Sequence, residues 1–151
     1  MPGRLIGIAR KDRPHAVMEV IGQARIGLDT GVEGDYRGAI KPGHNKRQVT
    51  IMMAEDWIAA LDQLGRPVEW QDRRVNLLVE GIVLPREAGA IVAIGSARFR
   101  ITGECDPCRR MDAVADGLQL ALRPDWRGGR TTIVMAPGEI AIGDEVRIEE
   151  Q

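Results

Sequence analysis

Segments in which every second residue is apolar recur along this 151-residue chain. In the stretch QVTIMM, Val49, Ile51 and Met53 occupy one face, and the polar residues Gln48 and Thr50 occupy the other. A period of two is the pattern of a strand with one buried face. Turns rich in Gly, Pro and charged residues separate the other segments predicted as strands. These are Leu5–Ala9, Met18–Ile26, Val75–Val79, Ala90–Ile94, Ala97–Thr102, Thr131–Met135 and Glu145–Glu150.

Two segments have helical periodicity instead. The first, Ala54–Gly65, ends at a glycine, a frequent C-terminal stop. Its apolar face consists of Trp57, Ile58, Leu61 and Leu64. The second is predicted to begin at Asp106 as N-cap, with Pro107 at the first helical position. Its apolar positions are Met111, Val114, Leu118 and Leu122, and Gly117 opens the alternative of two short pieces.

Many short strands and only two helices favour a mainly β fold, a small closed or nearly closed β-barrel with a few short helices. Closure removes the exposed edges that an open sheet would leave. The length suits one domain and is too short for two of ordinary size. We therefore expect residues 1–151 to form a single domain that needs no disulfide or metal for its stability.

Composition argues against several classes of function. The net charge of −1 and the five scattered aromatic residues provide neither the basic surface nor the stacking platform of a nucleic-acid-binding protein. No apolar run approaches the roughly 20 residues that cross a bilayer. The N-terminus lacks a signal-peptide pattern, and two cysteines without an export signal suggest a reducing compartment. We expect a cytoplasmic protein that binds neither nucleic acid nor membrane.

The stretch GECDPCRRMD contains both cysteines, Cys105 and Cys108, and allows four interpretations. A structural zinc site would also need His15 and His44, but these histidines are far apart in the sequence and lack a short spacing. A C-x-x-C redox pair usually follows a strand in a βαβ unit, and no such unit is evident. Two buried, inert thiols are the third interpretation, because free cysteine is among the most buried residue types.

The fourth interpretation is a reactive thiolate at Cys108. A helix that starts after Asp106 would place Cys108 in its first turn, where the helix dipole favours an anion. Arg109 and Arg110 add positive charge, whereas Asp106 and Asp112 oppose it. Two arginines and the dipole outweigh solvated carboxylates. The balance favours a thiolate that can bind a soft metal or carry a transferable sulfur atom.

Two further stretches could complement this thiol. The loop Gly31–Ile51 combines glycines, whose N–H groups can approach an anion, with cations that neutralise phosphate. It lacks the P-loop spacing, and a solvated surface loop is the alternative. Arg74 and Asn76 are alternate residues at a predicted strand start, so they would point to one face and grip a polar ligand. A surface ion pair and a turn residue are the alternative there. The loop's charged or titratable residues include Asp35, Arg37, Lys41, His44, Lys46 and Arg47.

Together these stretches resemble the MOSC domain, the family named after the C-terminal domain of molybdenum cofactor sulfurases. No single stretch is specific, whereas the ordered set is. The resemblance implies a β-barrel of the MOSC or PK-barrel type, in agreement with the strand pattern. The similar stretches, between about Ile26 and Ile148, are GVEGDYRG, KRQVTIM, RRVNLLVEGIVL, IGSARFRITGECDPC and GGRTTIVMAPGEIAIGDEV.

The resemblance also implies roles for individual residues. Cys108 matches the cysteine that ligates molybdenum in members with bound molybdenum cofactor (molybdopterin). In those members, basic and polar residues hold the phosphate of the pterin. The matching positions here are Arg74 and Asn76, Gly34 and Asp35, and, across an insertion in the loop, Lys46 and Arg47. Cys105 departs from the family pattern, and it either resolves a persulfide on Cys108 or has no role.

Two functional hypotheses follow from the resemblance. In the first, the chain is a molybdenum-dependent oxidoreductase for N-hydroxylated compounds, a reduction to which similar stand-alone bacterial members are linked, and a redox partner supplies electrons. In the second, it is a sulfur carrier without turnover, which holds a persulfide on Cys108 and delivers sulfur to a metal–sulfur centre. The chain has no room for the pyridoxal-phosphate-dependent domain of eukaryotic sulfurases, so a separate cysteine desulfurase would supply the sulfur.

Overall fold

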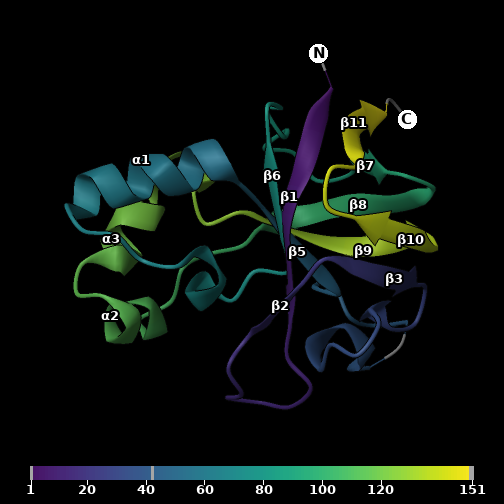
Figure 1. The fold of residues 1–151 in the computed structure, drawn as a ribbon, viewed down its shortest axis with the longest axis horizontal. Coiled ribbons are helices and arrows are strands. Elements are labelled where there is room, and N and C mark those ends of the chain that lie inside the picture. Colours follow the sequence, from purple (N-terminus) through teal and green to yellow (C-terminus); the bar gives the residue numbers. More distant parts are fainter. Residues whose placement is uncertain (1, 42, 150–151) are drawn as a thin grey trace.

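Seven strands close into a barrel in the computed structural model, which describes residues 2–41 and 43–149 (Figure 1). Each strand is hydrogen-bonded to the next, and the last returns to the first. All pairs are antiparallel except β5 with β6. The ring order is β1 (Gly3–Arg10), β11 (Glu145–Glu149), β7 (Ile91–Ile94), β8 (Ala97–Glu104), β9 (Arg130–Ala136), β5 (Val49–Met53) and β6 (Leu77–Glu80). The prediction of a mainly β, closed barrel is confirmed.

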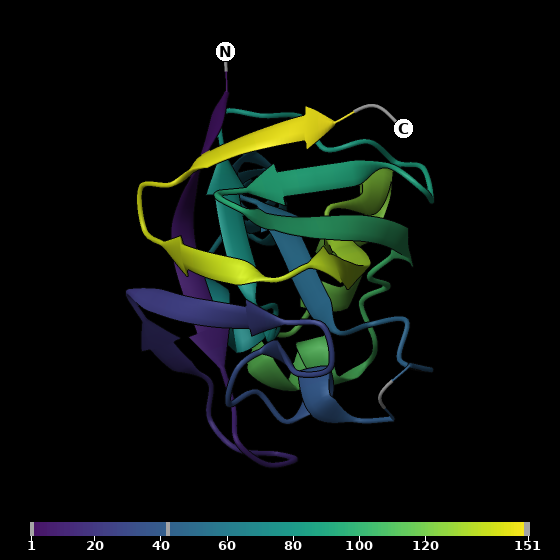
Figure 2. The ribbon, with the colours of Figure 1, turned by 90° about the vertical axis from the view of Figure 1, so that its right-hand side faces the viewer.

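A smaller antiparallel sheet lies beside the barrel (Figure 2). It consists of β10 (Gly138–Ala141), β3 (Gln23–Gly27) and β4 (Gly31–Val32), while β2 (Glu19–Ile21) pairs with the end of β1. The single strand predicted over Met18–Ile26 is therefore wrong. The chain leaves one sheet and enters the other at Gly22, so the two halves of this segment pair with different strands. Glu150, the last residue of the predicted final strand, lies outside the described residues.

Alternation in β5 sorts its side chains between two cores. Val49, Ile51 and Met53 point into the barrel, as the sequence predicted. Met52 belongs to a second apolar cluster outside the barrel wall, where the helices pack. All five residues of β5 are buried, because one face meets the barrel interior and helices or loops cover the other.

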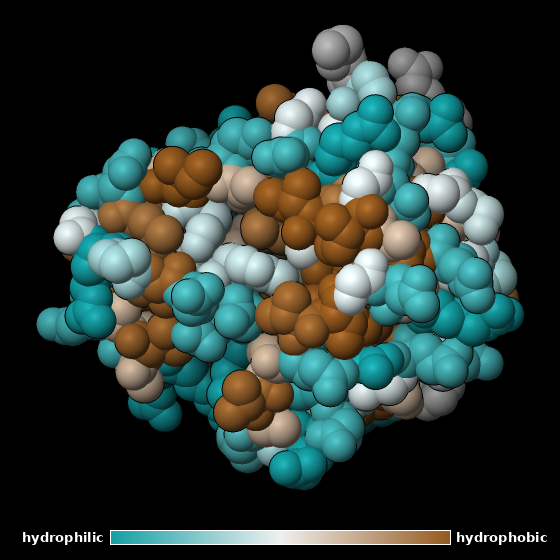
Figure 3. Space-filling model, viewed as in Figure 1, coloured by the Kyte–Doolittle hydropathy of each residue, from teal (hydrophilic) through white to brown (hydrophobic). Residues whose placement is uncertain are grey.

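Ile6 on β1 is among the exposed apolar residues, and Figure 3 shows apolar side chains gathered over the barrel on the face viewed there.

The helices lie on one side of the barrel (Figure 1). α1 (Ala54–Leu64) ends at Gly65 as predicted, and it packs Trp57, Leu61 and Leu64 in the second cluster. Ile58 is 58% exposed, which corrects its assignment to the buried face. No helix in the described part of the chain is long and apolar enough to cross a membrane.

The second predicted helix begins later than expected and is divided in two. α2 (Arg110–Val114) and α3 (Leu118–Leu122) are separated at Gly117, which has a φ of +92°. Asp106 does not cap a helix, because residues 105–108 have no regular secondary structure and Arg109 is the N-cap. The first-turn position predicted for Cys108 is therefore wrong, and a helix of five residues offers little dipole to an anion.

A close contact with β1 fixes the segment that carries two arginines of interest. This segment is η2 (Trp70–Arg73), a 3₁₀ turn like η1 (Arg37–Ala39) and η3 (Pro124–Trp126). A Cβ atom at Gly7 would lie only 2.6 Å from the Trp70 ring, so only glycine allows this approach. The contact seats η2 against the barrel and thereby places Arg73 and Arg74 at its end.

A buried arginine connects the barrel wall to α1 and to two loops. Arg130 is 2% exposed, and its guanidinium donates to the carbonyl oxygens of Leu84, Pro85 and Trp126. It also lies 3.5 Å from the Asp56 carboxylate on α1. One charged side chain thus satisfies backbone groups from two separate loops.

Arg130→Leu should lower the free energy of unfolding by about 3–5 kcal/mol, because it leaves three carbonyl oxygens and Asp56 without their partner. Arg86→Leu is the matched control. Its ion pair with Asp125 is exposed, so its loss should cost less than about 1 kcal/mol. Urea unfolding of both variants measures the difference. Equal losses would show that the Arg130 contacts contribute no more than a surface pair.

Candidate functional site

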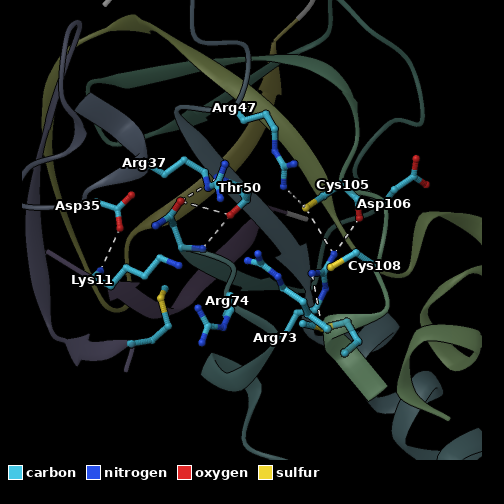
Figure 4. Close-up of a pocket in the computed structure, with 14 residues that line it drawn as sticks. Lys11, Asp35, Arg37, Arg47, Thr50, Arg73, Arg74, Cys105, Asp106 and Cys108 are labelled. Atoms are coloured by element: carbon cyan, nitrogen blue, oxygen red, sulfur yellow. Dashed lines mark hydrogen bonds between the residues drawn. The ribbon is translucent and has the colours of Figure 1, made fainter. Parts of the chain in front are cut away.

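A cavity of about 230 Å³ lies where the barrel meets the helical side (Figure 4). Both cysteines, Cys105 and Cys108, line it. The rest of its wall comes from the end of β1, the η1 loop, β5, η2 and the start of α2. Segments that are distant in sequence therefore meet at one hollow, which no local motif could have specified.

Positive charge dominates this cavity. Six cationic side chains line it, against the two carboxylates of Asp35 and Asp106. The cations are Lys11, Arg37, Arg47, Arg73, Arg74 and Arg110. Burial, followed by Arg74 and Arg37, lowers the pKa of Lys11, and Asp35 offsets only part of this effect. The site therefore favours an anionic ligand, because each added negative charge relieves repulsion between the cations.

The two cysteines differ in exposure. Cys105 is 2% exposed, whereas Cys108 is exposed, and neither is in a disulfide. The interpretation of two buried thiols is therefore wrong for Cys108. Positive charge reaches Cys108 from Arg110 and the other cavity cations rather than from a helix start.

Two guanidinium groups contact the buried cysteine. Arg73 Nη2 donates to Cys105 Sγ over 3.4 Å and Arg47 Nη2 does so over 3.6 Å (Figure 4). Arg73 also donates to the carbonyl oxygens of Cys105 and Gly128, at 2.8 and 2.9 Å. Arg73 was not predicted as a site residue from the sequence, where only the second residue of the Arg73-Arg74 pair was selected. No spacing signal distinguishes a buried arginine from an exposed one at such a doublet.

Arg74 and Asn76 both line the cavity but differ in setting. The strand predicted from Val75 begins only at Leu77, so alternation does not orient the pair. Arg74 is exposed, with a left-handed φ of 70°. Asn76 is buried, and its Oδ1 accepts from the backbone N–H and the hydroxyl of Thr50, at 3.1 and 3.2 Å. Its Nδ2 donates to the carbonyl oxygen of Ala9 at 3.1 Å, so this amide ties β1 and β5 to the segment that leads into β6.

Asp35 and Gly34 shape the loop beside the cavity. Asp35 is buried, and its carboxylate accepts from the N–H groups of Lys11 and Gly38, at 3.0 and 3.2 Å. Gly34 does not line the cavity; it has a φ of +89° and lies against the guanidinium of Arg10. A side chain at Gly34 would meet both backbone strain and this guanidinium.

The remaining predicted residues lie in different parts of the structure. Arg47 lines the cavity, whereas Lys46 lines another hollow together with His44 and Arg100. His15 is exposed on a different loop. Among the residues that the structure describes, no three His, Cys, Asp or Glu side chains are grouped to hold a metal ion, so the four-ligand zinc interpretation is not supported.

Comparisons with known proteins agree with this architecture. The family model described as the MOSC domain matches residues 40–147. The fold is similar to YuaD from Bacillus subtilis, with a TM-score of 0.81 and 20% identity over 100% of this chain and 98% of that one. It is also similar to YiiM from Geobacillus stearothermophilus, with a TM-score of 0.76 and 15% identity over 99% and 76% of the two chains. YiiM from Escherichia coli gives 0.66 and 14% over 98% and 70%. No curated protein matches the chain.

Lys11→Met should raise the free energy of unfolding at pH 7, since the charged lysine is disfavoured in the folded cavity. Between the lowered pKa of folded Lys11 and its ordinary value of 10.5, the unfolded chain binds more protons. The contribution of Lys11 to wild-type stability therefore rises with pH across this window, and the advantage of the variant shrinks. Urea unfolding from pH 7 to 10.5 measures both effects, with Lys46→Met as control. If Lys11→Met were less stable than the wild type at pH 7, the inferred cost of holding the charged lysine among the cavity cations would be wrong.

Proposed function

The chain belongs to the MOSC domain family, and from this premise we propose that it binds molybdenum cofactor (molybdopterin) in the cation-lined cavity, with the Cys108 thiolate as metal ligand. The observation that carries the proposal is the meeting of an exposed thiol and six cations in one cavity. The proposed reaction is the reduction of N-hydroxylated compounds, with electrons from a redox partner. The proposed unit is a single domain over residues 1–151.

The donor chemistry fits this group. A thiolate is a soft ligand of the kind that suits such a metal, and guanidinium groups bind a phosphate dianion through charge-assisted hydrogen bonds. Arg73 Nε is buried and has no hydrogen-bond partner among the described residues, which leaves one polar atom of the wall unsatisfied. The volume of about 230 Å³ is below the roughly 300–1,000 Å³ of sites that enclose a whole ligand. The cavity would therefore hold part of the cofactor and leave the rest at its open side.

The residues of the wall divide into binding and positioning roles. Arg74 and Arg110 have no ion-pair partner among the described residues, so they are available to a phosphate. Arg47, which precedes β5, also lines the cavity and is a third guanidinium donor for the phosphate. When bound, the cofactor supplies a metal centre for two-electron reduction.

The remaining matched positions fit a supporting role. Asn76 and Asp35 have their polar atoms engaged by backbone groups, so they position the wall rather than bind the ligand. Gly34 permits the turn that precedes Asp35. Lys46 belongs to the separate hollow and would contact only the part of a ligand that extends beyond the cavity.

A second function is favoured by the exposure of Cys108. An exposed thiol beside cations can accept sulfane sulfur from a cysteine desulfurase and hold it as a persulfide. In this alternative the chain carries sulfur to a metal–sulfur centre and performs no turnover. Partner access requires the reactive sulfur at the surface, and Cys108 meets this requirement whereas Cys105 does not.

Wild-type protein expressed with ample molybdate should contain molybdenum and pterin, and Cys108→Ser should lose most of the molybdenum. Arg74→Gln should reduce the pterin content several-fold, because a phosphate contact is lost. Arg109→Gln is the matched control, since Arg109 does not line the cavity. Metal analysis and pterin fluorescence per chain measure both, and reduction of an aromatic amidoxime tests turnover. Wild-type protein that holds neither molybdenum nor pterin would argue against cofactor binding.

Incubation with a cysteine desulfurase and cysteine should add one sulfur atom to the chain in the sulfur-carrier alternative. The Cys105→Ser variant isolates the exposed thiol, and it should gain the sulfur, whereas a Cys105→Ser/Cys108→Ser double variant should not. Intact mass under non-reducing conditions gives the result. The carrier function fails if Cys105→Ser gains no sulfur.

A further inference from the structure

Cys105 has a contact pattern that neither proposed function uses. Its Sγ lies within 3.4 Å of Arg73 Nη2 and 3.6 Å of Arg47 Nη2. Neither arginine forms an ion pair with a carboxylate among the described residues. Arg73 is only 5% exposed, and a buried cation ordinarily has an anionic partner. The Cys105 sulfur is the acceptor that both guanidinium groups share.

The two sulfurs are suited to different steps of one reaction. Cys105 is anchored, because its N–H donates to the carbonyl oxygen of Gly129 at 2.9 Å. Cys108 follows three residues later in a segment without regular secondary structure, and its sulfur forms no hydrogen bond among the described residues, so a local movement can turn it toward Cys105. Both residues line the same cavity (Figure 4). The thiolate is the form that attacks a disulfide-type sulfur, and the two guanidinium groups are placed to donate to it.

We propose that Cys105 is the resolving thiol of Cys108, an inference that rests on the sulfur-carrier function proposed above. The Cys105 thiolate attacks Sγ of a Cys108 persulfide. A bond forms between the two cysteine sulfurs, and the bond from Cys108 Sγ to the terminal sulfur breaks with its electron pair on the leaving hydrosulfide. The sulfane sulfur is reduced to sulfide while the two cysteines are oxidised to a disulfide, so no further oxidant or reductant enters this step.

The cavity also accounts for the leaving group. Hydrosulfide is an anion, and it is released into a hollow lined by six cationic side chains. The chain would thus deliver sulfur as hydrosulfide and require an external dithiol to reduce the disulfide before the next cycle. This differs from a carrier that passes the intact persulfide sulfur to its acceptor.

The test follows sulfur from a cysteine desulfurase supplied with cysteine, without added reductant. Wild-type protein should release about one hydrosulfide per chain and lose both titratable thiols to an intramolecular disulfide. Cys105→Ser should keep the added sulfur and release none, and Cys108→Ser should do neither. Cys105→Ala is a second variant in case the serine disturbs folding, and circular dichroism of each variant checks the fold.

Arg47→Gln separates a chemical role of Cys105 from a structural one. Hydrosulfide release is measured relative to the uptake of sulfur by the same substitution in the Cys105→Ser background, and this ratio should fall by roughly tenfold because one charged donor is lost. Arg109→Gln, which removes a charge outside the cavity, should release hydrosulfide at the wild-type rate. If Arg47→Gln and the wild type released hydrosulfide at equal rates, the Arg47 guanidinium would have no role in this step.

Two further results distinguish failure of the inference from failure of the carrier function. A stable persulfide on the wild-type chain, with no hydrosulfide, overturns the resolving role and leaves the carrier function intact. No sulfur on Cys105→Ser overturns both. Diamide, a thiol oxidant, provides a check that needs no sulfur donor: it should close the Cys105–Cys108 disulfide in the wild type, and two free thiols after this treatment would rule the resolving step out.

Discussion

The parallel pairing of β5 with β6 is the constraint on which the cavity depends. Two parallel neighbours cannot be joined by a tight hairpin, so the chain between them must cross over outside the barrel. Here the crossover is α1 followed by η2, and it creates the second apolar cluster against the outer wall. Arg73, Arg74 and Asn76 all lie where this crossover returns to the barrel. The same topological requirement therefore builds the helical layer and delivers the polar wall of the site.

The site is assembled at a cost to stability. Six cations converge with two carboxylates, one of which, Asp35, is engaged by backbone N–H groups rather than by a neighbouring cation. The lowered pKa of Lys11 reflects burial first and the repulsion of neighbouring arginines second. Outside the cavity, a buried charge is compensated by other groups of the protein: Arg130 is paired with Asp56 and with three carbonyl oxygens. Such a local excess of one charge is expected where the missing counter-charge comes from a ligand.

Patterns that depend on one element were readable from the sequence, and those that depend on several were not. The alternation of Val49, Ile51 and Met53 gave the correct inward face of β5, and Gly65 gave the end of α1. The helix start at Asp106 failed because the chain leaving β8 stays tied to β9: the Cys105 N–H still bonds to Gly129. That tertiary bond outweighs a capping preference worth about 1 kcal/mol.

Site residues follow the same division. Arg74 and Asn76 could be selected from the sequence, but their different settings depend on η2 and on Thr50 from another strand. Lys46 and Arg47 are neighbours in sequence, yet they face different hollows. Arg73 carried no signal, because its importance lies in contacts with residues more than 30 positions away. Charge density in a loop thus predicts a cationic region, and only the closed barrel decides which of its side chains share a cavity.

The end of β8 explains why two cysteines three residues apart have opposite environments. The ladder between β8 and β9 continues one residue beyond the strand to Cys105, which fixes this sulfur at the barrel rim under Arg73. Pro107 follows and has no N–H to extend the ladder. Cys108 therefore lies past the last point at which the sheet can hold the chain, exposed at the cavity. A rigid, buried sulfur and an accessible one within the same cavity are a direct consequence of where the sheet ends.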